Sequence, residues 1–271
     1  MEPNEIKKVT REYVKDIFGT PITDIIDKAL EREDNHPDEY LISTHFAFRQ
    51  EFKRIKGTAR RIEGFSELWY FLFIKKFLEK NLKTNHKIEF KPIESHERDL
   101  VHYHFEAEYG GNTLILSSDL SPGTNFDLKI HPTRKIRPDI FIGIRREDNK
   151  VIPIAIFEIK LHQNSPKSIG RIVSRFEQIR DTLLADNTEE PFFIFLYLQH
   201  SQYKFKLNKE KLAEFDVQLE RFKKILKKKS RLVINRIMKW NGEDPEENTI
   251  EGSIYQIMTE ICSFIKQLSP L

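Results

Sequence analysis

Two apolar runs joined by a short polar segment are the clearest pattern of hydrophobic and polar positions in this chain of 271 residues. Residues 137–144 are apolar and rich in β-branched side chains, residues 145–150 are polar, and residues 151–160 are apolar again. Runs of this length and composition predict two β-strands. Because the polar connection is short, we expect the strands to pair as an antiparallel hairpin.

The register of this hairpin depends on its turn. If Asp148-Asn149 is the central pair of a two-residue turn, the numbers of opposed residues add up to 297. This register would pair Ile144 with Pro153, Ile140 with Phe157, and Asp139 with Glu158. A bulge or a longer loop would shift the register, and Pro153 has no N–H group to donate to the ladder.

Segments with helical and strand-like patterns surround the hairpin. Residues 65–78 predict a helix that is apolar nearly all round and therefore buried. Residues 168–184 predict an amphipathic helix with Ser168 as its N-cap. Residues 191–200 predict a buried central strand. A helix, a strand meander, a crossover helix and a further strand indicate an α/β fold.

The remainder of the chain also divides by pattern. Strand-like runs between residues 87 and 131 are broken by Gly110-Gly111. Residues 206–230 and 252–268 predict helices, with an acidic turn at 242–247 between them. We expect a helical N-terminal region, which would read DNA or dimerise, an α/β core and a helical C-terminal region. Their bounds are 1–60, 61–205 and 206–271.

Asp139 and Glu158 would be cross-strand neighbours in the predicted register, with Cβ atoms roughly 4.5–5.5 Å apart. Lys160 follows Glu158 by two residues and so shares its face of the strand. Two carboxylates at that distance repel each other, and a cation between them removes the repulsion. The three residues therefore predict a site that holds a hard metal ion beside a phosphate.

The acid-x-Lys spacing alone decides little, because the chain contains 42 acidic and 45 basic residues. The spacing occurs six times, and the best alternative to Glu158/Lys160 is Glu89/Lys91. Glu158/Lys160 differs in its context, since it ends a strongly apolar strand and follows Pro138-Asp139. The other interpretation is an edge hairpin with a weak salt bridge between Lys160 and a carboxylate.

Pro138-Asp139 followed by Glu158-Ile159-Lys160 resembles the motif of the PD-(D/E)XK nuclease superfamily, and the resemblance covers about residues 67–200. It implies a restriction-endonuclease-like core with a central mixed β-sheet flanked by helices. It also implies that the two acids bind Mg²⁺, for which Mn²⁺ can substitute. The lysine would orient or help to deprotonate the attacking water.

Residues on the two predicted helices would complete this site. Glu67 matches by position an acidic residue that the family points at the metal, and its other interpretation is a first-turn acid favoured by the helix dipole. Arg171, Arg175 and Gln178 form a polar stripe that would reach a phosphate or orient a metal-bound water. Some relatives carry Gln-x-x-x-Tyr here, whereas Thr182 follows Gln178 in this chain. A solvated polar face is the other interpretation of Arg171.

The net charge of +3 is too small to indicate nucleic-acid binding, so the distribution of basic residues matters more. Two of three basic clusters flank the proposed site, where they would neutralise phosphates. The nucleic-acid contacts that we expect are Arg137, Lys135, Arg171 and Arg175. A solvated charged face is the alternative for each cluster.

Other classes of site have less support. The single cysteine, Cys262, lies in a predicted amphipathic helix and indicates core packing, so a disulfide framework and a cysteine-zinc site are excluded. His102 and His104 share a strand face, but no third ligand is evident, which favours an ordinary strand over a zinc site. Without an apolar run of membrane length or a secretory leader, we expect a cytoplasmic protein with no membrane partner.

The sequence therefore predicts a Mg²⁺-dependent endonuclease that hydrolyses phosphodiester bonds in DNA, of restriction or defence type. RNA remains an alternative substrate, and a homodimer is left open. One alternative is a catalytically silent nucleic-acid-binding or scaffold protein on the same fold. Another is a structural α/β domain with a chance motif, which carboxylates of Asp139 and Glu158 too far apart for a shared ion would indicate.

Overall fold

The structure of this chain is a computed structural model. It describes residues 63–82, 88–92, 104–118, 129–131, 134–135, 138–148, 151–161, 190–200, 230–240 and 243–268. It also describes single positions at 30, 31, 38, 41, 45, 171, 174, 217, 220 and 224.

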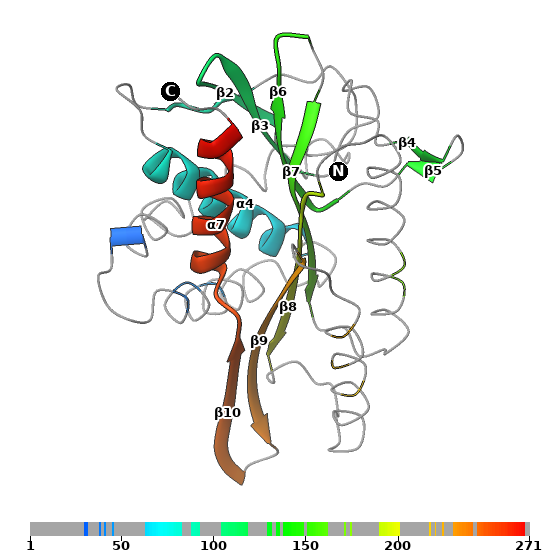
Figure 1. Cartoon of the computed structure of the whole chain (residues 1–271). Coiled ribbons are helices and arrows are strands. Elements are labelled where there is room, and N and C mark those ends of the chain that lie inside the picture. Colours follow the sequence, from blue (N-terminus) through cyan, green and yellow to red (C-terminus); the bar gives the residue numbers. More distant parts are fainter. Residues whose placement is uncertain are drawn as a thin grey trace, which may run out of the picture.

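The described elements form an α/β fold around a mixed sheet of eight strands, in the order β1-β2-β3-β6-β7-β8-β9-β10 (Figure 1). β7, β8 and β9 are parallel, and the other neighbours are antiparallel. The strands of this sheet are β1 (Lys91–Pro92), β2 (His104–Tyr109), β3 (Asn112–Ser118), β6 (Ile140–Arg145), β7 (Val151–Leu161), β8 (Phe192–His200), β9 (Ser230–Trp240) and β10 (Glu243–Glu251). β4 (Lys129–His131) and β5 (Arg134–Lys135) form a separate two-stranded sheet.

Helices α4 (Glu63–Asn81) and α7 (Ile254–Leu268) pack against each other and against the sheet, both on the same side of it (Figure 1). Trp69 and Phe73 of α4 are fully buried in one cluster with Ile261 of α7. The predicted apolar, buried helix is thus confirmed. Cys262 is also buried in this cluster, as predicted, and its burial raises the pKa of the thiol to about 12.

The two faces of the sheet have different surroundings. Ile140, Phe157 and Ile194 are neighbours in register on β6, β7 and β8, and all three belong to the cluster that contains α4 and α7. Because side chains alternate along a strand, Glu158 and its register neighbour Phe195 lie on the opposite face. α4 and α7 therefore cover the face that does not carry Glu158.

The hairpin of β6 and β7 confirms half of the predicted register. Ile140 pairs with Phe157, as predicted, so the numbers of opposed residues add up to 297 at this end. At the other end Ile144 pairs with Ile152 rather than with Pro153, and the last pair is Arg145 with Val151. The predicted two-residue turn at Asp148-Asn149 is therefore wrong, since residues 146–150 connect the strands.

A bulge between the two ends explains this change of register. The pairing shifts between Ile142 and Gly143, which leaves Ile154 as the extra residue of β7 beside Pro153. Pro153 cannot donate to the ladder, so the irregularity falls where a hydrogen bond would be missing anyway. Gly143 opposite it is closely packed, because a Cβ there would lie 2.6 Å from the ring of Phe141. The bulge thus keeps the Asp139 end of the hairpin in the predicted register.

The predicted helix at residues 252–268 is confirmed as α7. The C-terminal region 206–271 is not helical throughout, because it contains β9 and β10, which the sequence pattern did not predict. β9 pairs in parallel with β8, and its β-branched residues Val233, Ile234 and Ile237 favour this extended state. The acidic segment that looked like a turn belongs to β10, at the edge of the sheet. Pro245 fits there because an edge strand with a shifted register tolerates a residue without an N–H.

The structure describes other predicted elements in part, among them the N-terminal region and the predicted helix 168–184. Gly110-Gly111 forms the turn between β2 and β3, with positive φ angles of 57° and 75°. All five described positions within residues 1–60 are helical, as are Arg171 and Ser174 in the predicted helix 168–184. The rest of these two segments lies outside the described residues. Neither helix in the described part of the chain has the length and apolar character needed to span a membrane.

Candidate functional site

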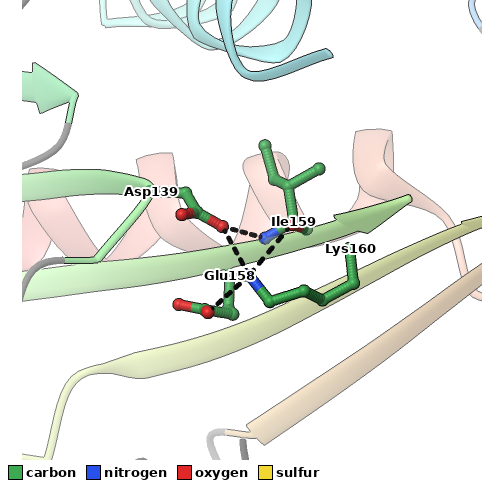
Figure 2. A network of polar contacts seen from close by, with 4 residues as sticks. All are labelled: Asp139, Glu158, Ile159 and Lys160. Atoms are coloured by element: carbon green, nitrogen blue, oxygen red, sulfur yellow. Dashed lines mark hydrogen bonds and ion pairs between the residues drawn. The ribbon is translucent and has the colours of Figure 1, made fainter. Parts of the chain in front are cut away.

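The start of β6 and the end of β7 bring the predicted site residues together. Because the two strands are antiparallel, Asp139, just before β6, lies beside the segment of β7 that carries Glu158 and Lys160 (Figure 2). The exposed fraction of the residues increases along this segment, since Glu158 is 1% exposed and Lys160 is half-buried. The site thus lies where β7 leaves the core and approaches solvent.

Asp139 is held on β7 by its side chain. Its Oδ2 accepts a hydrogen bond of 2.6 Å from the backbone N–H of Ile159 and one of 3.3 Å from Nζ of Lys160. The ladder of main-chain pairs ends at Ile140, so Asp139 meets β7 through its carboxylate rather than as a strand pair with Glu158. Figure 2 shows the other carboxylate oxygen pointing away from Lys160.

Glu158 is a buried acid with a charged neighbour. Its Oε1 lies 2.6 Å from Nζ of Lys160, and its side chain is only 2% exposed. A carboxylate removed from water loses a large hydration energy, which a close ammonium group offsets. In Figure 2 the nitrogen of Lys160 lies between the carboxylates of Asp139 and Glu158, while Ile159 points to the opposite side of β7.

The charge state of Lys160 follows from these contacts. Burial by itself lowers the pKa of the Lys160 ammonium, but the negative charges of Asp139 and Glu158 together outweigh it, so the net pKa is raised. Lys160 is therefore protonated at neutral pH in this arrangement. A protonated lysine donates hydrogen bonds and offsets negative charge, whereas it does not accept a proton from water.

The oxygen atoms around Lys160 fit a divalent metal ion. Asp139 and Glu158 both contact one nitrogen atom, so their carboxylates can reach one common cation. The carbonyl oxygen of Ile159 lies 3.2 Å from the same nitrogen. Mg²⁺ prefers such oxygen ligands and is usually held by one or two carboxylates together with several waters.

Glu67 is not brought into this group. Among the residues that the structure describes, no three His, Cys, Asp or Glu side chains are close enough to hold one metal ion. Glu67 is the fifth residue of α4 and so lies beyond its first turn, and α4 packs on the face of the sheet opposite to Glu158. The role of Glu67 as a metal ligand stays a prediction.

The structure describes only some of the other predicted site residues. Arg171 is helical and exposed, which agrees with a polar helix face. Lys135 belongs to β5 in the separate two-stranded sheet. Arg137, Arg175, Gln178 and His102 lie outside the described residues, while the backbone of His104 starts β2.

Strand β8 supplies neighbours of the site that the sequence did not indicate. Phe195 is in register with Glu158, and Tyr197 is in register with Lys160, so both lie on the face of the site. Both aromatic residues are buried, with ring centroids 6.3 Å apart. The segment reads as a buried strand in sequence, but only the parallel register identifies which of its residues adjoin the acids.

Comparisons of this chain with protein-family models, with curated proteins and with solved structures found no match.

Proposed function

We propose that this chain is a metal-dependent phosphodiesterase of the PD-(D/E)XK type that cleaves DNA. The observation that carries the proposal is that Asp139 and the buried Glu158 share a single cationic nitrogen, that of Lys160. Carboxylates too far apart for a shared ion would have indicated a chance motif. Their common contact supports a site that binds one cation between two strands.

The order of the elements supports the same family. A buried helix, α4, precedes the antiparallel strands β3, β6 and β7, and β8 then returns parallel to β7. A parallel return requires a crossover, and the helical positions Arg171 and Ser174 lie in that connection. This order agrees with a restriction-endonuclease-like core that is extended by β9 and β10.

Asp139, Glu158 and Lys160 would have separate roles in the proposed reaction. Asp139 and Glu158 would hold Mg²⁺, which when bound polarises the phosphoryl group and activates the attacking water. Lys160, protonated in the arrangement described above, would offset the negative charge that develops on the phosphate oxygens. The hydrogen bond from Ile159 to Asp139 keeps that carboxylate oriented. Because Lys160 is protonated, a role in which it accepts a proton from the attacking water has the least support.

The substrate is proposed to be DNA, and a restriction or defence role is the expected setting. The full-length protein should be incubated with plasmid, linear, single-stranded and branched DNA, and with RNA, in the presence of Mg²⁺ or Mn²⁺. We expect metal-dependent cleavage that EDTA abolishes and that Asp139→Ala removes. The matched control is Glu106→Gln, because Glu106 lies in another ion pair of the sheet. Equal cleavage by Asp139→Ala and the wild type would refute the assignment.

A catalytically silent nucleic-acid-binding protein is the second candidate. It is favoured by the position of Lys160, which fills the space between the two acids, and by the lack of a third acidic ligand among the described residues. In the same experiment this candidate predicts retention of DNA in a gel-shift assay without cleavage in either metal.

A further inference from the structure

Lys160 makes close contacts with three oxygen atoms that belong to three different groups. Its Nζ lies 2.6 Å from Oε1 of Glu158, 3.3 Å from Oδ2 of Asp139 and 3.2 Å from the carbonyl oxygen of Ile159. These are the atoms that would coordinate a metal ion. An ammonium group and a divalent ion cannot both occupy the space between them, because like charges at such a distance repel strongly.

We propose that Lys160 is the internal cation of this site, and that a divalent metal ion binds by displacing its ammonium group from the two carboxylates. This inference rests on the metal site of the proposed function. It adds that Lys160 controls the affinity of this site for the metal ion. Lys160 stabilises the two acids while no metal is bound, and it lowers the affinity of the site for metal by the cost of its own displacement.

The side chain is suited to this exchange. A lysine has a flexible four-carbon stem and a compact charge, so its ammonium group can move without a change in the backbone. The side chain of Lys160 is 23% exposed, whereas that of Glu158 is 2% exposed. The displaced ammonium group can therefore turn toward water, while Glu158 stays in place to bind the ion.

A second lysine–glutamate pair, which lies outside the proposed site, provides a matched control. Lys75 on α4 also lies 2.6 Å from a glutamate oxygen, that of Glu79, and these side chains are 17% and 15% exposed. This pair joins two positions on one helix and has no part in the proposed site. Replacement of Lys75 thus removes a half-buried lysine from a glutamate without a change at the metal position.

The experiment is a calorimetric titration of Mn²⁺ and Mg²⁺ into the full-length protein without nucleic acid. We expect Lys160→Met to bind metal about tenfold more tightly than the wild type or better, since a unit charge a few ångströms away has been removed. Lys75→Met should bind as the wild type does. Glu158→Gln should bind metal more weakly than the wild type. Substitutions of Glu158 and Lys160, whose side chains are in contact, would thus change the metal affinity in opposite directions.

Equal or weaker metal binding by Lys160→Met, with normal binding by the wild type, would overturn this inference alone. Absence of binding in the wild type and in every variant would overturn the proposed metal site itself, and the inference with it. If Lys160→Met does not fold without metal, Lys160→Gln keeps a polar side chain without the charge. The thermal midpoint of Lys160→Gln should then rise more on addition of Mn²⁺ than that of the wild type, and an equal rise contradicts the proposal.

Discussion

Two ion pairs lie on the same face of the sheet, at opposite ends of β6, and they differ in the balance of their charges. Arg145, the last residue of β6, donates hydrogen bonds of 3.2 Å and 2.6 Å to the two carboxylate oxygens of Glu106 on β2. At the other end, Lys160 contacts both Asp139 and Glu158. Among the residues that the structure describes, one pair joins an acid to a base, whereas the other group has two acids for one base.

Burial increases this difference. The side chains of Arg145 and Glu106 are 28% and 19% exposed, so water shares in the solvation of both charges. Glu158 is almost fully buried, and a second carboxylate lies close to the same lysine. A surplus of buried acid is costly in a purely structural site. The comparison indicates that charge surplus, rather than the presence of a salt bridge, distinguishes a candidate metal site from a stabilising pair.

The largest expected difference is in activity. Lys160→Ala should reduce the rate of metal-dependent DNA cleavage by about 10²–10³-fold, because a preorganised positive charge at the phosphate is lost. Arg145→Ala should leave the rate within about twofold. Its partner, Glu106, lies on β2 and has no part in the proposed site. Initial rates at saturating Mg²⁺ would test this, with circular dichroism as the control for folding. A similar loss in both variants would remove the distinction between the two ends of β6.

The next difference is in stability without metal. Lys160→Ala should lower the free energy of unfolding in EDTA by about 2–3 kcal/mol, because a buried carboxylate loses its charged neighbour. Arg145→Ala should lower it by about 1 kcal/mol or less, as is usual for a partly exposed pair. Mn²⁺ should restore the stability of Lys160→Ala and leave that of Arg145→Ala unchanged. Urea unfolding with and without metal measures the free energy of unfolding of both variants. If Mn²⁺ does not restore the stability of Lys160→Ala, the charge argument is contradicted.

The smallest effects are expected at the second acid-x-Lys sequence. Glu89 and Lys91 are both exposed, and Lys91 lies in the short edge strand β1. Replacement of either residue by alanine should change the free energy of unfolding by less than about 0.5 kcal/mol. Cleavage should also be unchanged. A substantial loss of activity in either variant would mean that the motif has been assigned to the wrong pair.

The sequence predicted those features that depend on local pattern. Alternation and β-branched residues identified the strands on either side of the turn, and the nearly continuous apolar pattern of residues 65–78 identified a buried helix. The pairing of Ile140 with Phe157 was also correct, which places Asp139 beside Glu158 and Lys160. These features are encoded within about 20 residues, so no distant partner is needed to specify them.

Features that depend on distant partners were missed. β9 carries basic residues after a helical pattern, and its extended state depends on pairing with β8, some 40 residues earlier in the chain. α4 covers the face of the sheet opposite to Glu158, and helical periodicity does not contain the information of which face a helix covers. The sequence allows a bulge in this hairpin, but its position beside Pro153 depends on the packing around Gly143.

The bond between Asp139 and the backbone of Ile159 has a consequence for the part of the chain that precedes Pro138. The carboxylate is positioned by its contacts with β7, and the main-chain ladder has already ended at Ile140. Its location is therefore set by β7 rather than by the residues that precede Pro138. A change in chain length before Pro138 should thus leave the carboxylate of Asp139 on β7.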